Sequence, residues 1–212
     1  DCDLISISKE YKVKIIQHSK NLGKGSAILS GIEYLNKINV DYAICIDADG
    51  QHYAEDIPKF IEAINDEHTI LVGNRDFSNE CIPQSSKFGR YFSNFWTQIE
   101  TGIAVNDTQC GFRAYPVKYI AQLRFIFRKY NFESEVLVKA SWAGIKIINI
   151  PVKVWYPEKN EKRVSSFRPI VDNIRFAITH TYLVTLRILP LKHKKLIKTG
   201  KGNKEVFKTI IN

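Results

Sequence analysis

The sequence predicts an α/β protein with a mostly parallel, Rossmann-like sheet flanked by helices, and three observations support this fold class. Short apolar segments alternate with helical segments along much of the 212-residue chain, as in strand–helix–strand units. Each apolar segment is nearly continuous, which is typical of strands buried on both faces. The length suits one substantial core with at most a small appendage.

The elements follow in chain order from local patterns. Residues 4–11 indicate the end of a helix, and residues 13–16 a short strand. A glycine-containing loop at residues 21–25 precedes a helix over residues 26–36, whose apolar residues share one face. Further strands are predicted at residues 42–46, 69–73 and 145–154, and helices at residues 57–64, 87–101, 133–143 and 169–189.

Two of these helices carry distinctive patterns. The helix over residues 87–101 has an aromatic stripe, which we interpret as core packing. The helix over residues 169–189 is amphipathic, with Arg175 and Arg187 on its polar face. It could pack on the sheet or lie in a membrane interface, and the pattern leaves both open. We therefore divide the chain into an α/β domain, residues 1–168, and a C-terminal amphipathic helix with a basic tail, residues 169–212.

The chain is basic, with a formal net charge of +9 and a pI of about 9.3. A basic surface attracts phosphates of nucleic acids, lipid headgroups or nucleotide sugars. The absence of zinc-finger spacing and of an arginine-rich arm favours a membrane surface over nucleic acid. The four cysteines form no CxxC pair and do not suggest a disulfide framework, so we expect a reducing, cytoplasmic compartment.

From the sequence given we expect no signal peptide, and it contains no apolar run long enough for a complete transmembrane helix, which needs about 18 residues or more. It also contains no methionine, not even at position 1. We therefore expect that residues before Asp1 are missing, or that methionines were lost or replaced.

Two carboxylates follow the apolar strand at residues 42–46 directly, in the run Asp47-Ala48-Asp49. The carboxyl end of a strand is the edge of an α/β sheet where ligands bind. Two hard oxygen ligands there suit Mg²⁺ or Mn²⁺ bridged to a diphosphate. An ordinary Asp-rich turn explains the same residues, so the acid pair alone does not distinguish a metal site from a turn.

Other candidate site residues lie in loops. Lys24 stands in the glycine-containing loop at a helix N-terminus, which suits phosphate binding or serves as a tight turn. Arg75 follows a strand and could reach a diphosphate or pair with Asp76. Arg113 could likewise reach a diphosphate or form an ordinary ion pair. Asp107 could orient or deprotonate an acceptor, or it could cap a turn.

Glu133 and Glu135 open a predicted helix, where the helix dipole favours acidic side chains. A pair of carboxylates could also indicate a glycosidase. Two acids on one helical turn rarely flank a glycosidic bond, however, so we disfavour that interpretation.

Taken in order, these segments resemble the family 2 glycosyltransferases of GT-A fold, and among them the dolichol- and polyprenyl-phosphate mannosyl- and glucosyltransferases. The resemblance covers about residues 13–170, and its most specific part is the run Asp-Thr-Gln-Cys-Gly-Phe-Arg. It is carried by six segments, namely Asn21–Gly25, Asp47–His52, Gly73–Arg75, Asp107–Arg113, Phe132–Glu135 and Ile150–Val152.

The resemblance implies an inverting, metal-dependent hexosyltransferase of EC 2.4 type. Its donor would be a GDP- or UDP-linked sugar, and its acceptor a polyprenyl or other lipid phosphate, or a glycan. The roles it assigns are metal binding by Asp47, Asp49 and Gln51 with Mg²⁺ or Mn²⁺, donor binding by Lys24, Asp47 and Arg75, and catalysis by Asp107 and Arg113. It also implies a location in the cytoplasm, peripheral at the cytoplasmic membrane face.

The chain departs from the family pattern in three ways. The family's N-terminal nucleoside-binding segments have no counterpart, so we expect an N-terminally truncated domain. Ser166 stands where bacterial relatives have His, and the transmembrane helices of some relatives are absent. Two alternatives therefore remain: a non-catalytic nucleotide-sugar or lipid-binding module with a decayed site, and a nucleotidyltransferase.

Overall fold

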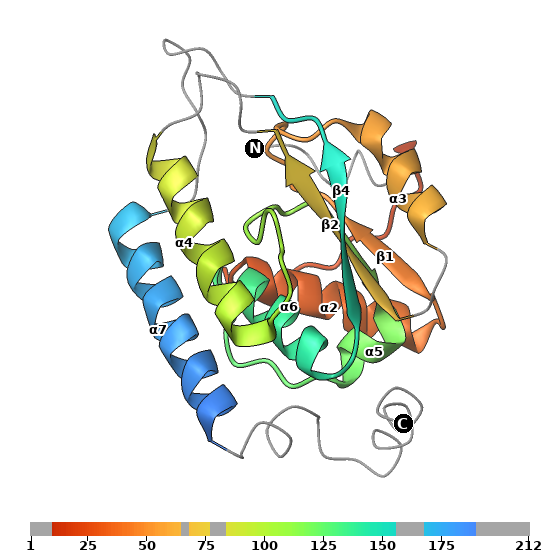
Figure 1. Cartoon of the computed structure of the whole chain (residues 1–212). Coiled ribbons are helices and arrows are strands. Elements are labelled where there is room, and N and C mark those ends of the chain that lie inside the picture. Colours follow the sequence, from red (N-terminus) through yellow and green to blue (C-terminus); the bar gives the residue numbers. More distant parts are fainter. Residues whose placement is uncertain (1–9, 65–67, 77–83, 156–167, 190–212) are drawn as a thin grey trace.

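The computed structural model describes residues 10–64, 68–76, 84–155 and 168–189, and its centre is a four-stranded sheet (Figure 1). The strands are β1 (Tyr42–Cys45), β2 (Thr69–Arg75), β3 (Arg113–Pro116) and β4 (Lys146–Val152), in the spatial order β1-β3-β2-β4. β2 and β4 are parallel, while β3 runs antiparallel to both of its neighbours. The sheet is therefore mixed, with β3 reversed among strands of one direction.

Helices surround this sheet. They are α2 (Lys24–Lys37), α3 (Ile57–Ala63), α4 (Gln84–Thr101), α5 (Val117–Gln122), α6 (Phe132–Trp142) and α7 (Pro169–Ile188), with a 3₁₀ turn at Ala54–Asp56 before α3. α2 packs on α5 and α6, and α6 also supports α4 and α7. α4 and α7 lie side by side at one flank of the molecule (Figure 1).

The core lies where the strands meet these helices. Ile70, Leu71 and Val72 of β2 are fully buried, as a continuous apolar strand predicts. The Phe60 ring of α3 stacks on Phe112 with the ring centroids 4.3 Å apart. Burying each such large side chain contributes about 1.5–3 kcal/mol, so this packing fixes the loop before β3.

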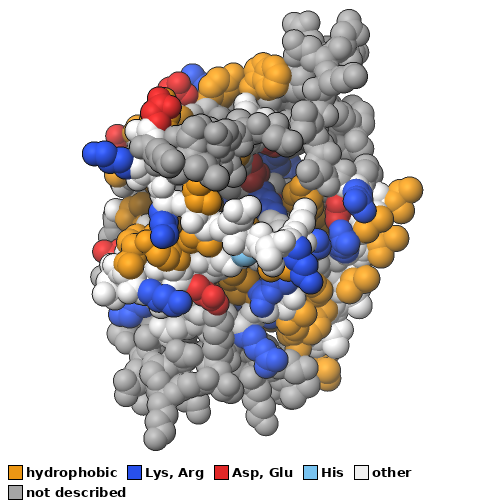
Figure 2. Space-filling model, turned by 180° about the vertical axis from the view of Figure 1, so that it is seen from behind, with side chains coloured by type: hydrophobic (Ala, Val, Ile, Leu, Met, Phe, Trp, Pro, Cys, Tyr) orange, Lys and Arg blue, Asp and Glu red, His pale blue; other side chains and the backbone are white. Residues whose placement is uncertain are grey.

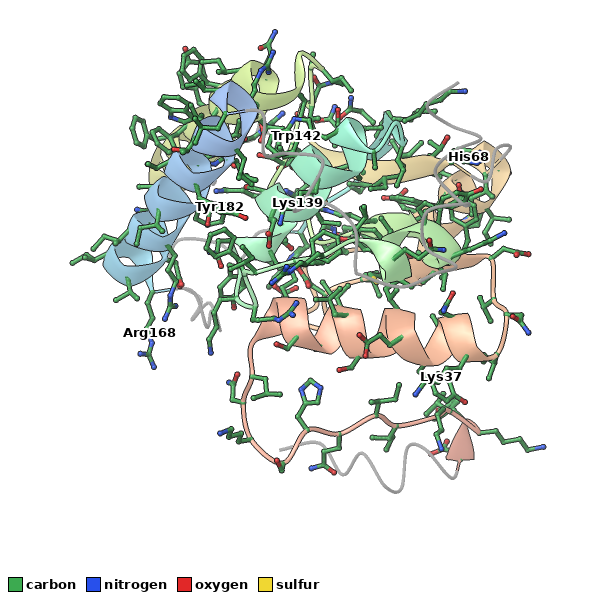
Figure 3. The ribbon with its side chains drawn as sticks, turned by 90° about the horizontal axis from the view of Figure 1, so that it is seen from below. Lys37, His68, Lys139, Trp142, Arg168 and Tyr182 are labelled. Atoms are coloured by element: carbon green, nitrogen blue, oxygen red, sulfur yellow. The ribbon has the colours of Figure 1, made fainter. Side chains whose placement is uncertain are left out.

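Polar contacts within the interior hold α6 and α7 in place. Lys139 and Glu135 form a buried ion pair at 2.6 Å, and the Glu135 carboxylate accepts hydrogen bonds from the Ile126 and Phe127 backbone N–H groups. The Lys139 ammonium also lies 5.6 Å from the centre of the Tyr182 ring of α7 (Figure 3). These contacts position α7 against α6.

Most predicted elements are confirmed, with ends shifted by a few residues. β3 and α5 were not predicted. The segment 113–116 begins with an arginine and ends with a proline, so it has no strand pattern of its own. It is a strand because its backbone pairs with β1 on one side and β2 on the other.

The strand predicted at residues 13–16 is wrong. These residues form no ladder with any described strand, and Val13, Ile15 and Ile16 remain 36–50% exposed. An apolar segment becomes a strand only where a partner satisfies its backbone groups. The helix predicted at residues 4–11 lies almost entirely outside the described residues, as do the loop at 156–167 and the basic tail at 190–212.

The interpretation of the α4 aromatic stripe as core packing is wrong for three of its five side chains, whereas Phe92 and Trp96 are half-buried against His180 of α7. Phe88 and Tyr91 are 70% and 71% exposed, and Phe95 is 47% exposed. α4 instead turns Ser93, Thr97 and Glu100 inward, all three fully buried. Among the described residues, no helix combines the length and apolarity that crossing a bilayer requires.

Candidate functional site

The site begins at the carboxyl end of β1, where Asp47 meets the first residues of two helices. Lys24, the first residue of α2, places its Nζ 2.8 Å from Asp47 Oδ2 and 2.5 Å from Glu133 Oε1 at the start of α6. The Glu133 side chain is almost fully buried, whereas that of Asp47 is 30% exposed. One ammonium therefore bridges two carboxylates, of which one faces solvent.

Burial alone would lower the pKa of Lys24, but the attraction of Glu133 and Asp47 outweighs it and raises that pKa above its ordinary value. Lys24 thus stays charged at neutral pH. A fixed cation at a helix N-terminus, next to backbone N–H groups, suits an incoming phosphate.

The loop before β3 passes very close to this cluster. A Cβ atom on Gly111 would lie 2.0 Å from Asp47 Oδ2 and 2.6 Å from Lys24 Nζ. A larger residue here would push the Asp47 carboxylate and the Lys24 ammonium out of their present positions. A glycine at this position therefore lets the loop approach the ion pair without disturbing it.

The turn after Asp47 holds the other residues predicted to bind metal. Asp49 is exposed, and its Oδ1 accepts a hydrogen bond from the Gln51 backbone N–H at 3.1 Å. Gln51 is buried, and its backbone carbonyl accepts a hydrogen bond from the Trp155 N–H at 2.9 Å, which ties the turn to the chain that follows β4. The exposed carboxylate of Asp49 therefore stands on a turn that the fold holds in place.

His52 connects this turn to the second half of the site. Its ring packs edge-on against Phe112, with the ring centroids 5.4 Å apart. Burial lowers the pKa of His52, and the positive charge of Arg75 lowers it further, while Asp47 and Asp49 act in the opposite direction. The imidazole therefore lies within the electrostatic reach of both the acid pair and Arg75.

At the end of β2, Arg75 forms a two-point ion pair with Asp107. Arg75 Nε and Nη2 lie 2.6 and 2.9 Å from the two Asp107 oxygens, and the Arg75 backbone N–H also donates to Oδ2. Asp107 is fully buried. The structure thus joins two residues that were predicted for different roles, in a bidentate ion pair.

Arg113 is enclosed in the protein interior, whereas an arginine that binds a phosphate must reach the ligand. It is fully buried, and its guanidinium donates to the backbone carbonyls of Cys110, Glu133 and Thr108 at 2.7–2.9 Å. These bonds tie the loop before β3 to the start of α6. The described geometry therefore makes Arg113 a residue that positions the site.

A basic pocket of about 480 Å³ opens beside Arg75. Its lining combines four cationic side chains with one carboxylate and comes from α3, α4 and the ends of β2 and β4. The lining residues are Lys59, Asn74, Arg75, Asp76, Arg90, Pro151, Val152 and Lys153. A pocket of this charge suits a phosphate or phosphate ester.

Two residues of the site were missed by sequence reasoning. Glu133 was explained by the helix dipole, although it also binds Lys24. Arg90 of α4 gave no signal, yet it donates to Asn106 O at 2.7 Å and to Asn74 Oδ1 at 3.3 Å. Its place beside Asp107 depends on how α4 packs, which no local pattern encodes.

The cysteines near the site are not nucleophiles. Burial raises the pKa of the Cys45 thiol to about 11 and that of Cys110 to about 12. Both thiols are therefore protonated at neutral pH, and the thiolate is the reactive form. The chemistry of this site rests on carboxylates and cations.

Asp47 and Asp49 fit an ion such as Mg²⁺ or Mn²⁺, which takes one or two protein carboxylates and completes its shell with phosphate and water oxygens. Within the described ranges, no group of three or more His, Cys, Asp or Glu side chains is arranged to hold a metal alone.

Comparison with known proteins identifies the class. The model of glycosyl transferase family 2 matches residues 3–129, and the chain belongs to this family. Its mixed sheet with flanking helices agrees with the GT-A architecture expected for that family.

Curated relatives include glycosyltransferases that are named for dolichyl and undecaprenyl phosphates. The chain is 34% identical over 160 residues to a UDP-N-acetylglucosamine–dolichyl-phosphate N-acetylglucosaminyltransferase of Methanococcus voltae, covering 72% of this chain and 63% of that protein. It is 21% identical to an undecaprenyl-phosphate mannosyltransferase of Micrococcus luteus, covering 74% and 67%. A dolichol-phosphate mannosyltransferase of Pyrococcus furiosus is 39% identical over 69 residues, covering 32% and 19%. The chain thus spans about two thirds of the length of the first two relatives.

Proposed function

We propose that this chain carries the catalytic site of a glycosyltransferase that moves a sugar from a nucleotide sugar to a polyprenyl or related lipid phosphate. The observation that carries the proposal is that His52 lies within the electrostatic reach of two contrasting regions. One is Asp47 and Asp49, which follow β1, and the other is Arg75, which lines a pocket with four cations at the end of β2. Two relatives support it, since their names describe transfer to dolichyl and undecaprenyl phosphates.

The donor would bind at the end of β1. Lys24 and the N-terminus of α2 would receive its phosphates, since a cation lies there at the positive end of the helix dipole. Asp47 and Asp49, with the Gln51 side chain, would hold Mg²⁺ or Mn²⁺. The ion would neutralise charge on the departing nucleoside diphosphate.

The acceptor phosphate would bind in the basic pocket, where Arg75, Arg90, Lys59 and Lys153 can balance its charge. One of its oxygens would attack the anomeric carbon. The bond from that carbon to the donor phosphate oxygen would break, and the nucleoside diphosphate would leave with the electron pair. Attack from the face opposite the leaving group inverts the anomeric configuration.

Asp107 would act mainly by holding Arg75. A phosphate acceptor is already anionic at neutral pH, so it needs no strong base. Asp107 is buried and accepts three hydrogen bonds from Arg75, which aims that guanidinium at the pocket. Arg113 would act in a similar indirect way, through the loop that carries Gly111.

A transfer assay tests this proposal. The purified chain is incubated with Mn²⁺, polyprenyl phosphate in detergent, and radiolabelled UDP-N-acetylglucosamine or GDP-mannose in separate reactions. We expect label to enter the organic phase with one donor, and Asp49→Asn to remove it. Donor binding without transfer or hydrolysis would instead support a non-catalytic binding module.

A further inference from the structure

A half-exposed tryptophan stands beside the turn that carries the acid pair. Trp155 is 46% exposed, whereas tryptophan side chains are highly buried on average. Its backbone N–H donates to the Gln51 carbonyl at 2.9 Å, which brings the two residues side by side. The chain's other two tryptophans, Trp96 and Trp142, are half-buried among α4, α6 and α7. The exposed ring of Trp155 is therefore accessible to a ligand.

The backbone pairing determines which side chains share a face with Trp155. His52 and Val154 form an antiparallel bridge just beyond the end of β4. Opposite residues of an antiparallel pair point to one face, and their neighbours along each segment point to the other. The His52 ring packs against Phe112 in the interior, so His52 and Val154 point toward the core. The opposite face, which we call the Trp155 face, therefore carries four side chains, namely Gln51, Tyr53, Lys153 and Trp155.

The exposure of the segment after β4 agrees with this assignment. Lys153 and Trp155 are exposed, whereas Val152 is buried and Val154 is half-buried. Gln51 stands directly opposite Trp155 in the pairing, and opposite residues have Cβ atoms about 4.5–5.5 Å apart. The Trp155 side chain is therefore the neighbour of the Gln51 amide on this face.

The Trp155 face joins the two halves of the candidate site. Gln51 belongs to the turn that carries Asp47 and Asp49, where the donor diphosphate would bind. Lys153 lines the basic pocket, where the acceptor phosphate would bind. Figure 2 shows acidic and basic side chains together in a recess of the upper half of the molecule, the end at which β2 and β4 terminate in Figure 1.

This location fits the sugar of the donor better than its nucleoside. In the proposed reaction the sugar is bonded to the diphosphate and is attacked by the acceptor phosphate, so it lies between them. The nucleoside is attached to the other end of the diphosphate and extends away from the acceptor. Trp155 is beside Gln51 and two residues from Lys153, so it stands between the two phosphate sites.

The side chains of the Trp155 face also have the chemistry that a sugar requires. A pyranose ring has an apolar C–H face and a rim of hydroxyl groups. The Trp155 ring offers a flat apolar surface, and three polar groups surround it: the Gln51 amide, the Lys153 ammonium and the hydroxyl of Tyr53, which is 41% exposed. Small-molecule sites combine aromatic surface with a few polar groups in this manner.

We propose that the sugar of the donor packs against the Trp155 ring, with its hydroxyl groups at the polar side chains of the Trp155 face. Trp155 then distinguishes a nucleotide sugar from a free nucleotide, because only the former carries the group that the ring contacts. The inference rests on the proposed function, which sets the donor diphosphate at the end of β1 and the acceptor phosphate in the basic pocket.

Calorimetric titration with two ligands that differ only in the sugar tests this inference. The purified chain is titrated in Mn²⁺ with UDP-N-acetylglucosamine and UDP, and separately with GDP-mannose and GDP. Trp155→Ala should bind the nucleotide sugar of the preferred pair about three to ten times more weakly than wild type, since an aromatic contact is lost. It should bind the free nucleotide as wild type does, and Trp155→Phe should recover most of the affinity for the nucleotide sugar.

The matched control is Phe88→Ala, which removes an exposed aromatic ring of α4 outside the Trp155 face and should bind both ligands as wild type does. Thermal unfolding without ligand shows whether each variant is folded. If Trp155→Ala is not, tryptophan fluorescence in Mg²⁺ provides the test. The nucleotide sugar should change the wild-type emission more than the free nucleotide does, and Trp155→Phe should lack this additional change.

Two kinds of failure can be told apart. An equal loss of affinity for nucleotide sugar and free nucleotide in Trp155→Ala, or no loss for either, would overturn the inference and leave the proposed function standing. An additional fluorescence change that persists in Trp155→Phe would do the same. A wild-type chain that binds none of the four ligands would overturn the proposed function, and the inference with it.

Discussion

The carboxylates at the ends of β1 and β2 lie in contrasting environments. At β1, Asp47 and Asp49 reach solvent, and Asp47 shares the Lys24 ammonium with Glu133. At β2, Asp107 is fully buried and bound at two points by Arg75. Exposed carboxylates are available to a ligand, whereas a buried and fully paired one holds its partner in place. Substitution of Asp107 should therefore lower the stability of the fold, whereas substitution of Asp49 should weaken ligand binding and leave the stability nearly unchanged.

The largest effect on stability is expected from Asp107→Ala. It leaves Arg75, whose side chain is only 13% exposed, without its counter-ion, and removing one partner of a buried pair costs about 3–5 kcal/mol. Urea denaturation would measure the change. Asp107→Asn keeps the shape of the side chain and one acceptor oxygen, so this variant should lose clearly less stability than Asp107→Ala. If Asp107→Ala were as stable as wild type, the pair would not hold this end of the sheet.

A smaller loss is expected from Gly111→Ala, because the new Cβ would displace Asp47 and Lys24. Such overpacking costs about 1–3 kcal/mol. Gly31→Ala is the matched control: no atom lies within 4 Å of its added Cβ, and alanine stabilises a helix relative to glycine by about 0.5–1 kcal/mol. Thermal melts of both variants should therefore shift in opposite directions. A shared direction would contradict the close approach of the loop.

The pH dependence should show a still smaller effect at His52. Its pKa is lowered in the folded protein by burial and by Arg75, so the unfolded chain takes up a proton first as pH falls below about 6.5. Wild type should then lose stability relative to His52→Gln between that pH and the lower folded pKa, and the difference should be constant above about pH 7. Denaturation curves across this range would measure it. A wild type that loses stability relative to His52→Gln as pH rises through this range would contradict the assignment.

Local patterns were enough to predict most of the fold. β2 forms at a continuous apolar segment and is buried along that segment. α2 forms where apolar residues recur at helical spacing, and the residues of that face are the buried ones. β3 escaped prediction because its strand geometry comes from pairing with β1 and β2. The stripe on α4 misled for a related reason: spacing shows that side chains share a face, but only packing decides whether that face is inside.

The site was predictable in part. Lys24, Asp47 and Asp49 follow strand and helix ends, which a sequence pattern can locate. The pairing of Arg75 with Asp107 joins residues 32 positions apart, and the Arg113 guanidinium donates its hydrogen bonds to backbone carbonyls. Neither fact has a local signal, because both depend on how the loop before β3 folds back over β2.

The smallest effect on stability is expected from Asp49→Asn, which keeps the oxygen that accepts the Gln51 N–H and lies on the surface. Stability should change by less than about 0.5 kcal/mol. Nucleotide binding should nevertheless be lost, in contrast to the behaviour expected at Asp107. Asp41→Asn, at another exposed carboxylate before β1, is the matched control.

Calorimetric titration of UDP and GDP in the presence of Mn²⁺ tests the central claim most directly. The wild-type chain and Asp41→Asn should bind one of these nucleotides in a metal-dependent manner, and Asp49→Asn should bind it at least about tenfold more weakly. Equal, metal-dependent binding by wild type and Asp49→Asn would contradict the assignment of the donor site to the end of β1.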